Sequence, residues 1–487
     1  MKLSNKIPAR KTIMLFNGIF FILLACYASY ALSIIMRLPL QSWDESLNLL
    51  SSWEMQKSGD WIGITRHGVL DHWDIKPPLF TWLSALSFMV FGFSEWAGRL
   101  PSVLFGLSTL MLFYFFLVSI TRNYLLGIMS TFGIGLSIAF FGQHGIISGD
   151  YESMLTFFIL LSFISIHKIF FEKKQRWMLL LALSLGLGFM TKSVVGLIPI
   201  FFIIPTIIIN KGLGFKPDFK IIILSLTLFC LTVIPYFLIR ESKYHENYLQ
   251  LLFSVDVYPK IFGTMIDHQG GWDFYFIQMN IVFREWSKVF YLILLYILFL
   301  LIKDRRLVMN HWKTGLLSLA GVIIYLLIFS FSRFKSSWYF QPVYPIMILF
   351  IAIVLDGLLN AKFLWIIPIA MSLILIYEAR NLVLHVNDKF NRDYEYMTKK
   401  IILPNKDLIK DKTIISADTL MPSAITYADI LSNGKHTIYS TYQNLNQHII
   451  NKKDYDLILA TDTSKVNNKE DLILITASGS MGLYQRR

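Results

Sequence analysis

Charged residues are scarce in this chain, and their scarcity excludes a simple soluble enzyme. Of its 487 residues only 16% are charged, whereas soluble domains average about 25%. Instead, 55% of the residues are hydrophobic and 15% are aromatic, which is more apolar surface than a soluble domain keeps out of water. The composition therefore predicts an integral membrane protein and excludes a disordered chain.

Cysteine is nearly absent as well. The chain has two cysteines, Cys26 and Cys230, and both lie inside apolar runs far apart in the sequence. They therefore form neither a disulfide framework nor a cysteine-based metal site, and redox chemistry is not expected.

Acidic residues are outnumbered by basic ones, 32 against 45, which gives a formal net charge of +13. Such an excess is typical either of nucleic-acid binding or of a polytopic membrane protein, which gathers Lys and Arg in its cytoplasmic loops. The distribution described below favours the membrane protein and excludes nucleic acid as a partner.

Apolar runs of the length that crosses a bilayer core, about 17 to 25 residues, recur over most of the chain. We predict about eleven transmembrane helices, and up to thirteen if marginal crossings are included. They lie near residues 12–35, 97–119, 124–145, 152–170, 177–190, 194–210, 219–239, 288–302, 315–331, 339–357 and 361–379.

The first run follows four cations, which predicts a cytoplasmic N-terminus. A cleaved signal peptide is the alternative, but its apolar region is usually about 7 to 15 residues long, shorter than this run. Counting from there, the even-numbered loops are cytoplasmic. These loops hold Arg122, Lys168, Lys173, Lys174, Arg176, Lys211, Lys216, Lys220, Lys303, Arg305, Arg306 and Lys313.

The same register places three segments on the outer side: a first loop at 36–96, a second at 240–287, and everything after about residue 380. Residues 79–93 are apolar but too short for a comfortable span, so we interpret them as an interfacial or re-entrant helix. The predicted domains are a transmembrane domain over 1–379 and a small extracytoplasmic α/β domain over 380–487. In the latter we expect strands at 413–417, 437–439, 455–460 and 472–476, and a helix from Pro422 to Asn433-Gly434.

Acidic residues open the first outer loop and recur at the same membrane level. Asp44 and Glu45 follow the first span, and Asp150 stands at the outer end of the third. A carboxylate at that boundary can act as a general base or bind a divalent cation, although each could equally be a solvated loop residue or a helix cap. Two acids at one level favour an outer-face site.

Several cations stand on the outer side, where the positive-inside rule does not require them. Each could be an interface anchor, but together they could converge on one phosphate. They are Lys76, Arg99, Lys192, Arg333 and Lys335.

In order and topology these motifs resemble the bacterial, protein-mannosyltransferase-like arm of the GT-C fold glycosyltransferases. Relatives of this kind include the lipid A aminoarabinose transferases and similar polyprenyl-phosphate-sugar transferases. The resemblance covers residues 10–350. The motifs that carry it are Asp44-Glu45, the Trp61 segment, Lys76-Pro77-Pro78-Leu79, Arg99-Leu100-Pro101, Asp150, Thr191-Lys192 and the run Lys335, Tyr339, Pro342, Pro345.

The resemblance implies an inverting glycosyltransferase of the inner membrane that takes a sugar from undecaprenyl phosphate or a similar carrier. The acceptor would be lipid A or another envelope glycolipid, and no organic cofactor is expected. Asp44, Glu45 and Asp150 would be catalytic, and a divalent metal would lie at Asp44, Asp74 and His268. The donor phosphate would be bound by Lys76, Arg99, Lys192, Arg333, Lys335 and Tyr339. The chain departs from the aminoarabinose enzymes at Ile75, where they place Glu, and in its short outer domain.

Two other functions remain open from the residues. A transporter or flippase of lipid-linked sugars would also need cations near an isoprenoid phosphate, but usually shows broken helices in repeated halves. An O-antigen polymerase or ligase would centre its chemistry on a later loop, here 240–287. The clustering of unusual charges at one face favours the transferase.

Overall fold

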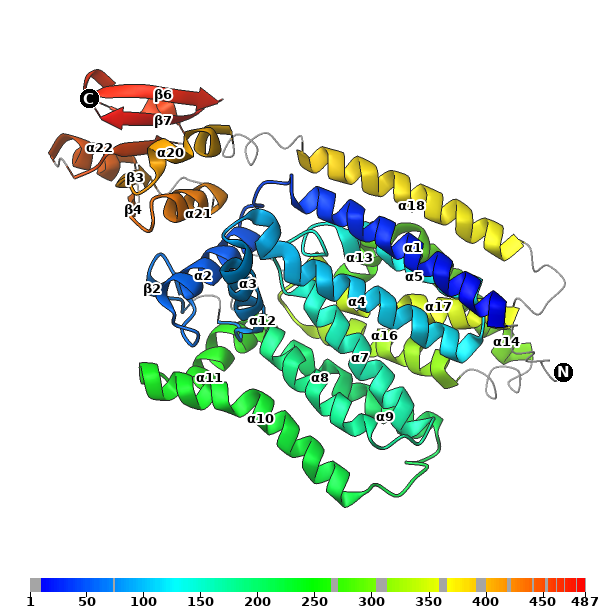
Figure 1. The fold of residues 1–487 in the computed structure, drawn as a ribbon. Coiled ribbons are helices and arrows are strands. Elements are labelled where there is room, and N and C mark those ends of the chain that lie inside the picture. The colour runs from blue at the N-terminus through cyan, green and yellow to red at the C-terminus, as the bar shows by residue number, and fades with distance from the viewer. Residues whose placement is uncertain are drawn as a thin grey trace.

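The structure is a computed structural model. It describes residues 10–72, 75–263, 270–303, 313–358, 366–390, 400–417, 422–439, 442–451, 454–460, 462–467, 469–478 and 480–486. A bundle of long helices fills most of the molecule, and a small sheet domain lies beyond one end of it (Figure 1). We call that end, which also carries the first loop, the loop end.

Within the described residues, eight helical stretches are long and apolar enough to cross a membrane, which confirms a multi-pass membrane protein. These stretches are α1 (Arg10–Ile35), α4 (Glu95–Thr121), α7 (Glu152–Phe170), Trp177–Ile209, α10 (Phe219–Tyr244), α16 (Lys313–Phe331), Ser337–Leu358 and α18 (Ile366–Phe390). A further long helix is α14 (Arg284–Lys303).

The stretch Trp177–Ile209 is a hairpin of two passes rather than one long helix. It consists of α8 (Trp177–Lys192), η1 (Ser193–Phe202) and α9 (Ile203–Ile209), and the backbone turns at Ser193, where φ is 45° and ψ is −133°. A Cβ on Gly188 would lie 3.2 Å from the Gly196 carbonyl oxygen, whereas one continuous helix would separate these residues by about 12 Å. The two predicted spans at 177–190 and 194–210 therefore correspond to two antiparallel passes.

The predicted span at 124–145 is wrong as a continuous helix. The helix α5 (Tyr124–Gly135) ends early, and Ser137 caps the short α6 (Ile138–Phe141). Residues 142–151 then form an irregular, largely buried segment that reaches α7. Irregular backbone at this depth is tolerated where it is buried in protein or lines a cavity, so the segment is a candidate site element.

The first loop folds into a compact layer at the loop end (Figure 1). It contains α2 (Asp44–Ser58), a hairpin of β1 (Thr65–Arg66) and β2 (Val69–Leu70), and α3 (Leu79–Phe91). The helix α3 has 13 residues, as expected for a segment too short to span the membrane. The second loop adds α11 (Tyr248–Leu251), the π-helical η2 (Leu252–Val257), α12 (Tyr258–Phe262) and α13 (Phe274–Val282). The spanning stretch Ser337–Leu358 consists of η3 (Ser337–Val343), which continues into α17 (Tyr344–Leu358).

The C-terminal domain is a five-stranded mixed sheet with the order β4-β3-β5-β7-β6. Its strands are β3 (Ile414–Ala417), β4 (His436–Tyr439), β5 (Leu457–Ala460), β6 (Leu472–Ser478) and β7 (Met481–Arg486). The helices are α20 (Lys406–Ile409), α21 (Pro422–Leu431) and α22 (Tyr442–Asn451), with short η4 (Leu403–Asn405), η5 (Thr463–Lys465) and η6 (Lys469–Asp471). Four strands and α21 lie where the sequence predicts them, whereas β7 and α22 were not anticipated. The helix α18 continues to Phe390, past the expected boundary at residue 380.

The hairpin of the first loop is joined to the C-terminal domain by His67, which shares the carboxylate of Asp429 with His436 of that domain. Asp429 on α21 accepts from His67 Nδ1 at 2.5 Å and from His436 Nδ1 at 2.9 Å. Burial opposes the charge on both groups, but Asp429 still raises the pKa of His67, and the two histidines lower the pKa of Asp429. Glu54 adds to the rise at His67, and Arg66 opposes it.

These shifts predict a pH-dependent contact between the hairpin and α21. The charge of Asp429 stabilises the contact above the pKa that this residue has in the unfolded chain, and the stabilisation is lost as the pH falls through its lowered pKa. The charge of His67 stabilises the contact below the pKa that it has in the unfolded chain, and the stabilisation is lost as the pH rises through its raised pKa. The protection factors of the amides of residues 65–70, which remove the intrinsic pH dependence of hydrogen exchange, are therefore expected to be highest in mildly acidic buffer and to fall from pH 7 to 9. His67→Gln is expected to remove the alkaline limb of this profile. A profile identical in wild type and variant would contradict the assignment.

Candidate active site

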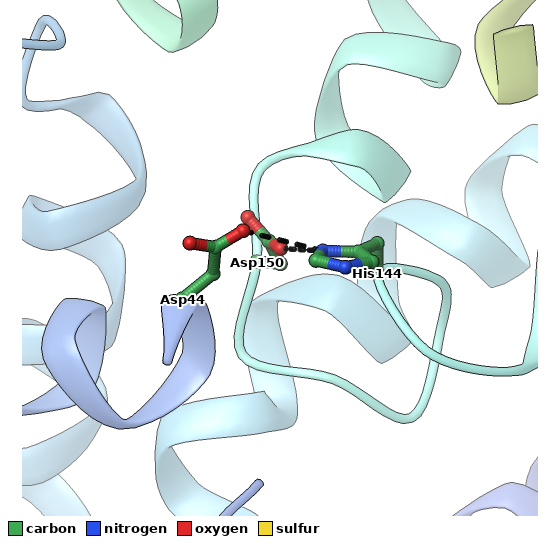
Figure 2. A group of neighbouring side chains, drawn as sticks. All are labelled: Asp44, His144 and Asp150. Carbon is green, nitrogen blue, oxygen red and sulfur yellow. Dashed lines mark hydrogen bonds and ion pairs between the residues drawn. The ribbon is translucent and has the colours of Figure 1, made fainter. Parts of the chain in front are cut away.

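Three side chains from two separate segments meet at the loop end (Figure 2). Asp44 is the first residue of α2, and His144 and Asp150 come from the irregular segment before α7. One ligand atom of each lies within 4.8 Å of the others. His144 Nδ1 hydrogen-bonds to Asp150 Oδ2 and lies 3.8 Å from Asp44 Oδ2. We call these three residues the acidic cluster.

The backbone on both sides of the cluster is strained. Trp43, directly before Asp44, has φ 69°, and His144 has φ 60°. Left-handed backbone at residues other than glycine costs free energy and tends to persist where surrounding contacts enforce it, often at functional sites. Asp150 is buried, and its Oδ1 accepts the Tyr151 N–H at 2.7 Å. Asp44 is the accessible member, with 38% of its side chain exposed.

His144 lies between carboxylates that favour its charged form. Its ring stacks on Trp338, with the centroids 4.0 Å apart. Burial alone would lower its pKa, but the charge and hydrogen bond of Asp150, with smaller contributions from Glu152 and Asp44, raise it above the ordinary value. The histidine can therefore share a proton with both acids of the cluster, or give it up to a bound cation.

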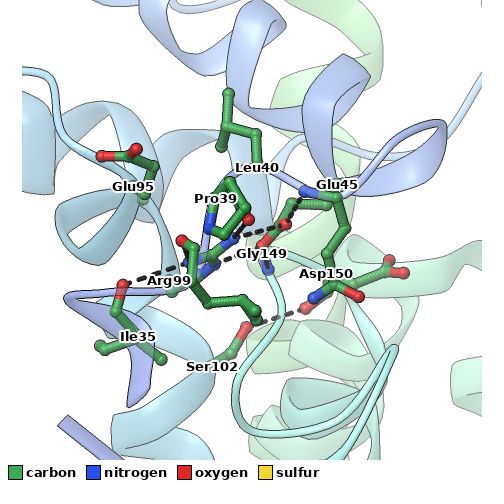
Figure 3. A network of polar contacts seen from close by, with 12 residues as sticks. Ile35, Pro39, Leu40, Glu45, Glu95, Arg99, Ser102, Gly149 and Asp150 are labelled. Atoms are coloured by element: carbon green, nitrogen blue, oxygen red, sulfur yellow. Dashed lines mark hydrogen bonds and ion pairs between the residues drawn. The ribbon is translucent and has the colours of Figure 1, made fainter. Parts of the chain in front are cut away.

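Glu45 and Arg99 form a buried ion pair behind the cluster (Figure 3). Arg99 Nε and Nη2 donate to the two oxygens of Glu45 at 2.6 and 2.8 Å, and its other N–H groups are directed at backbone carbonyls of residues 35, 38 and 39. Glu45 also accepts the Gly149 N–H at 2.7 Å. A guanidinium has five N–H donors, and protein oxygens take them all. This geometry revises the sequence interpretation: Arg99 shapes the site and offers no N–H to a phosphate, and Glu45 is its structural partner.

Two of the expected phosphate ligands, Lys76 and Lys192, lie against aromatic rings beside the cluster. Lys192 Nζ is ion-paired with Glu152 and lies 4.3 Å from the Tyr339 ring centroid. Lys76 Nζ lies 4.6 Å from the centroid of Tyr151. The ammonium groups of Lys76 and Lys192 therefore lie near Tyr151 and Glu152, the two residues that follow Asp150.

A further lysine, which sequence analysis did not single out, joins this group. Lys260 on α12 is ion-paired with Asp256, and Asp256 Oδ2 also accepts from Ser193 Oγ at 3.3 Å, next to Lys192. Burial opposes the charge of Lys260, but Tyr339 and Asp256 nevertheless raise its pKa, and the charge of Lys76 acts against them. Lys76, Lys192 and Lys260 therefore surround Tyr339 and Tyr151, and we call them the lysine group.

The remaining candidates have other roles or lie elsewhere. Lys335 is buried, and its ammonium donates to the carbonyls of Phe329, Ser330 and Ser332, which end α16. Those three bonds use all its N–H donors, so the structure revises its assignment from phosphate ligand to helix cap. Arg333 is exposed and packs on Gly263. The predicted metal ligands Asp74 and His268 lie outside the described residues.

Parts of this chain resemble known proteins in sequence. A model of the family dolichyl-phosphate-mannose-protein mannosyltransferase matches residues 50–246. An uncharacterized protein of Aquifex aeolicus is 26% identical over 325 residues, which is 66% of this chain. The chain spans 59% of that relative's length.

Two solved structures extend the likeness to the fold of the whole chain. ArnT from Cupriavidus metallidurans, bound to undecaprenyl phosphate, matches with a TM-score of 0.68 at 14% identity, over 98% of each chain. The oligosaccharyltransferase of Archaeoglobus fulgidus matches with a TM-score of 0.51 at 10% identity, over 90% of this chain and 69% of its own. This likeness in structure confirms the predicted fold class. The chain has the GT-C fold, with a small sheet domain at its C-terminal end.

Proposed function

We propose that the protein is an inverting glycosyltransferase that moves a sugar from a polyprenyl-phosphate carrier to an acceptor on the outer face of a bacterial cytoplasmic membrane. The observation that carries this proposal is the segment Asp150-Tyr151-Glu152. Asp150 belongs to the acidic cluster, Tyr151 faces Lys76, and Glu152 pairs with Lys192. Three consecutive residues thus join an acid that can activate an acceptor to cations that can stabilise a departing phosphate.

The acidic cluster performs the acceptor half of the reaction. Asp44, its exposed member, takes the proton of an acceptor hydroxyl while the hydroxyl oxygen attacks the anomeric carbon of the donor sugar. His144 and the buried Asp150 hold Asp44 in place and share the charge that it gains or loses. The new bond forms on the face opposite the leaving group, so the configuration at the anomeric carbon inverts.

The lysine group performs the donor half. The bond between the anomeric carbon and the phosphate oxygen breaks, and its electron pair leaves with the polyprenyl phosphate. Lys76, Lys192 and Lys260 are placed to neutralise that phosphate, and their aromatic neighbours Tyr151 and Tyr339 limit access of water.

Replacing Lys76 by Met is expected to raise the KM for the lipid-linked donor about ten- to hundredfold, because one charge-assisted contact to the phosphate is lost. The matched control is Lys173→Met, an exposed lysine outside the loop end. The measurement is steady-state transfer at varied donor concentration. Equal KM values in the two variants would remove Lys76 from the donor site.

The acidic cluster also fits a divalent cation. Its two carboxylates and one imidazole are ligands that Mn²⁺ and Zn²⁺ accept, and Glu152 Oε2 is buried nearby without a hydrogen-bond partner. We propose that Asp44, His144 and Asp150 hold the ion, in place of the expected set Asp44, Asp74 and His268. A bound cation supplies Lewis-acid stabilisation of anionic oxygen.

The cation is tested by paramagnetic resonance of the purified protein titrated with Mn²⁺. We expect saturable binding with one ion per chain, and at least a tenfold weaker affinity in Asp150→Asn, because a ligand charge is lost. Asp273→Asn, an exposed carboxylate elsewhere in the chain, is the control. Identical titrations in all three proteins would show that the cluster does not hold the ion.

The acceptor that we propose is lipid A or another envelope glycolipid, with the N-terminus in the cytoplasm and the C-terminal domain outside. The cations of the expected cytoplasmic loops support this orientation, and the likeness to ArnT supports the acceptor class. Mass spectrometry of lipid A and envelope glycans from matched strains with and without the gene tests it. Loss of one sugar mass from a glycolipid is expected. Unchanged glycolipids together with a lost sugar on polysaccharide or protein would move the acceptor to that class.

A further inference from the structure

Tyr427 of the C-terminal domain reaches into the first loop of the membrane domain. It lies on α21 and is 2% exposed. Its hydroxyl donates to Glu95 Oε1 at 2.7 Å and accepts the Leu40 N–H at 3.1 Å. One hydroxyl from a separate domain therefore ties the start of α4 to the segment that leads from α1 to α2.

The segment held by Tyr427 is also held by Arg99. The guanidinium donates to Leu38 O at 2.6 Å and Pro39 O at 2.7 Å, directly before Leu40 (Figure 3). Glu95, the acceptor of the Tyr427 hydroxyl, lies one helical turn before Arg99 on α4. Tyr427 and Arg99 thus fix the same short segment and the same helix end.

From Arg99 the contacts continue without a gap to the acidic cluster. Arg99 binds both oxygens of Glu45, and Glu45 accepts the N–H groups of Gln41 at 2.6 Å and Gly149 at 2.7 Å. Glu45 is the neighbour of Asp44 in α2, and Gly149 is the neighbour of Asp150. The network therefore sets the backbone on both sides of the cluster.

The helix α21 reinforces this link along the first turn of α2. Thr426 Oγ1 donates to Ser46 O at 3.1 Å, and the hydroxyls of Ser42 and Ser423 lie 3.0 Å apart. These contacts flank Asp44 in the sequence. Through them the C-terminal domain contacts the residues on both sides of Asp44, which we propose takes the acceptor proton.

We infer that Tyr427 is a positioning residue for the acidic cluster, and that the C-terminal domain is part of the support of the active site. The inference concerns geometry and stands on these contacts. Only its kinetic consequence rests on the proposed function.

Hydrogen exchange tests the geometry without an activity assay. In Tyr427→Phe, which keeps the ring and removes the hydroxyl, exchange of the amides of Gln41 and Gly149 is expected to accelerate about tenfold. Tyr455→Phe, a buried tyrosine packed in another part of the same domain, is expected to leave both amides unchanged. Unchanged exchange in Tyr427→Phe would overturn the inference. If that variant does not fold, Glu95→Ala, which removes the acceptor of the Tyr427 hydroxyl, carries the same test from the other partner.

The kinetic arm separates positioning from general stability. Once wild type shows transfer, Tyr427→Phe is expected to lower kcat about tenfold with the donor KM changed less than twofold, since donor contacts are untouched. If Tyr427 only stabilised the fold, kcat would fall in proportion to the loss of folded protein. Melting curves of Tyr427→Phe, with Tyr455→Phe as the control, measure that loss. A fall in kcat no larger than this loss would contradict a positioning role. Absence of transfer in wild type would sink the proposed function, and the exchange arm would still decide the inference.

Discussion

Asp44→Asn is expected to lower sugar transfer by about 10²- to 10⁴-fold, the range that a general base contributes, while the protein stays in the membrane at its normal level. The amide has the shape of the carboxylate but neither takes the acceptor proton nor supplies a charge to a cation. Asp44 has 38% of its side chain exposed, so the change buries no unpaired group and should not unfold the chain. The effect is therefore expected in the rate and not in the amount of protein.

The measurement is complementation of a deletion strain, with the modified glycolipid quantified by mass spectrometry and the protein by immunoblot. Asp273→Asn, an exposed carboxylate outside the cluster, is the matched control and is expected to restore wild-type product. Near-normal product from Asp44→Asn would remove the acidic cluster from the chemistry.

Arg99→Ala, in the first turns of α4, is expected to be strongly destabilising. It leaves Glu45, which is 2% exposed, as a buried carboxylate without its partner, and breaking such a pair typically costs about 3–5 kcal/mol. It also removes the donors to three backbone carbonyls. Thermal unfolding in detergent is expected to show a clearly lower Tm.

The double variant Arg99→Met with Glu45→Leu distinguishes the two roles considered for Arg99. Removing both charges is expected to recover part of the lost Tm, because no buried charge then remains unpaired. If Arg99→Ala instead kept the wild-type Tm and raised only the KM for the donor, Arg99 would be a ligand of the donor phosphate.

The sequence predicted a polytopic helical membrane protein and the level of the site, because both follow from hydrophobic length and from charge, whereas the GT-C fold was expected from the family resemblance. Asp44 and Asp150 each stand at the end of an apolar run, and the register of crossings puts these two ends on one side. The structure brings the two carboxylates into one cluster. The positive-inside rule singled out Lys76 and Lys192 on the same side, whereas Tyr339 was expected only from the family resemblance.

Hydrogen-bond partners are what the sequence could not reveal. Arg99 and Lys335 stand on the side where cations are unusual, and that property is shared by a phosphate ligand and by a structural donor. The structure distinguishes these two roles by the hydrogen-bond acceptors. Arg99 donates to the carbonyls of residues 38 and 39, and Lys335 donates to those of residues 329, 330 and 332.

His144 was hidden inside a predicted span, since the apolar run around it continues past the break at Ser137. The one signal was local: Ser137 and the glycines at 142, 145 and 149 are residues that end helices. Lys260 was missed because the order of the second loop in space depends on contacts far apart in sequence. The strand β7 lacks a regular alternation of apolar and polar residues, so its pattern did not reveal it.

The most direct test of the central claim is the conversion of a purified polyprenyl-phosphate-sugar to polyprenyl phosphate by the purified protein in vesicles that contain acceptor lipid. Liquid chromatography with mass spectrometry follows both lipids, and NMR of the isolated product gives the configuration at its anomeric carbon. The account predicts that wild type releases one polyprenyl phosphate for each sugar transferred, with inverted configuration at the anomeric carbon, and that Asp44→Asn releases almost none. Equal release by wild type and Asp44→Asn, or a product with retained configuration, would contradict it.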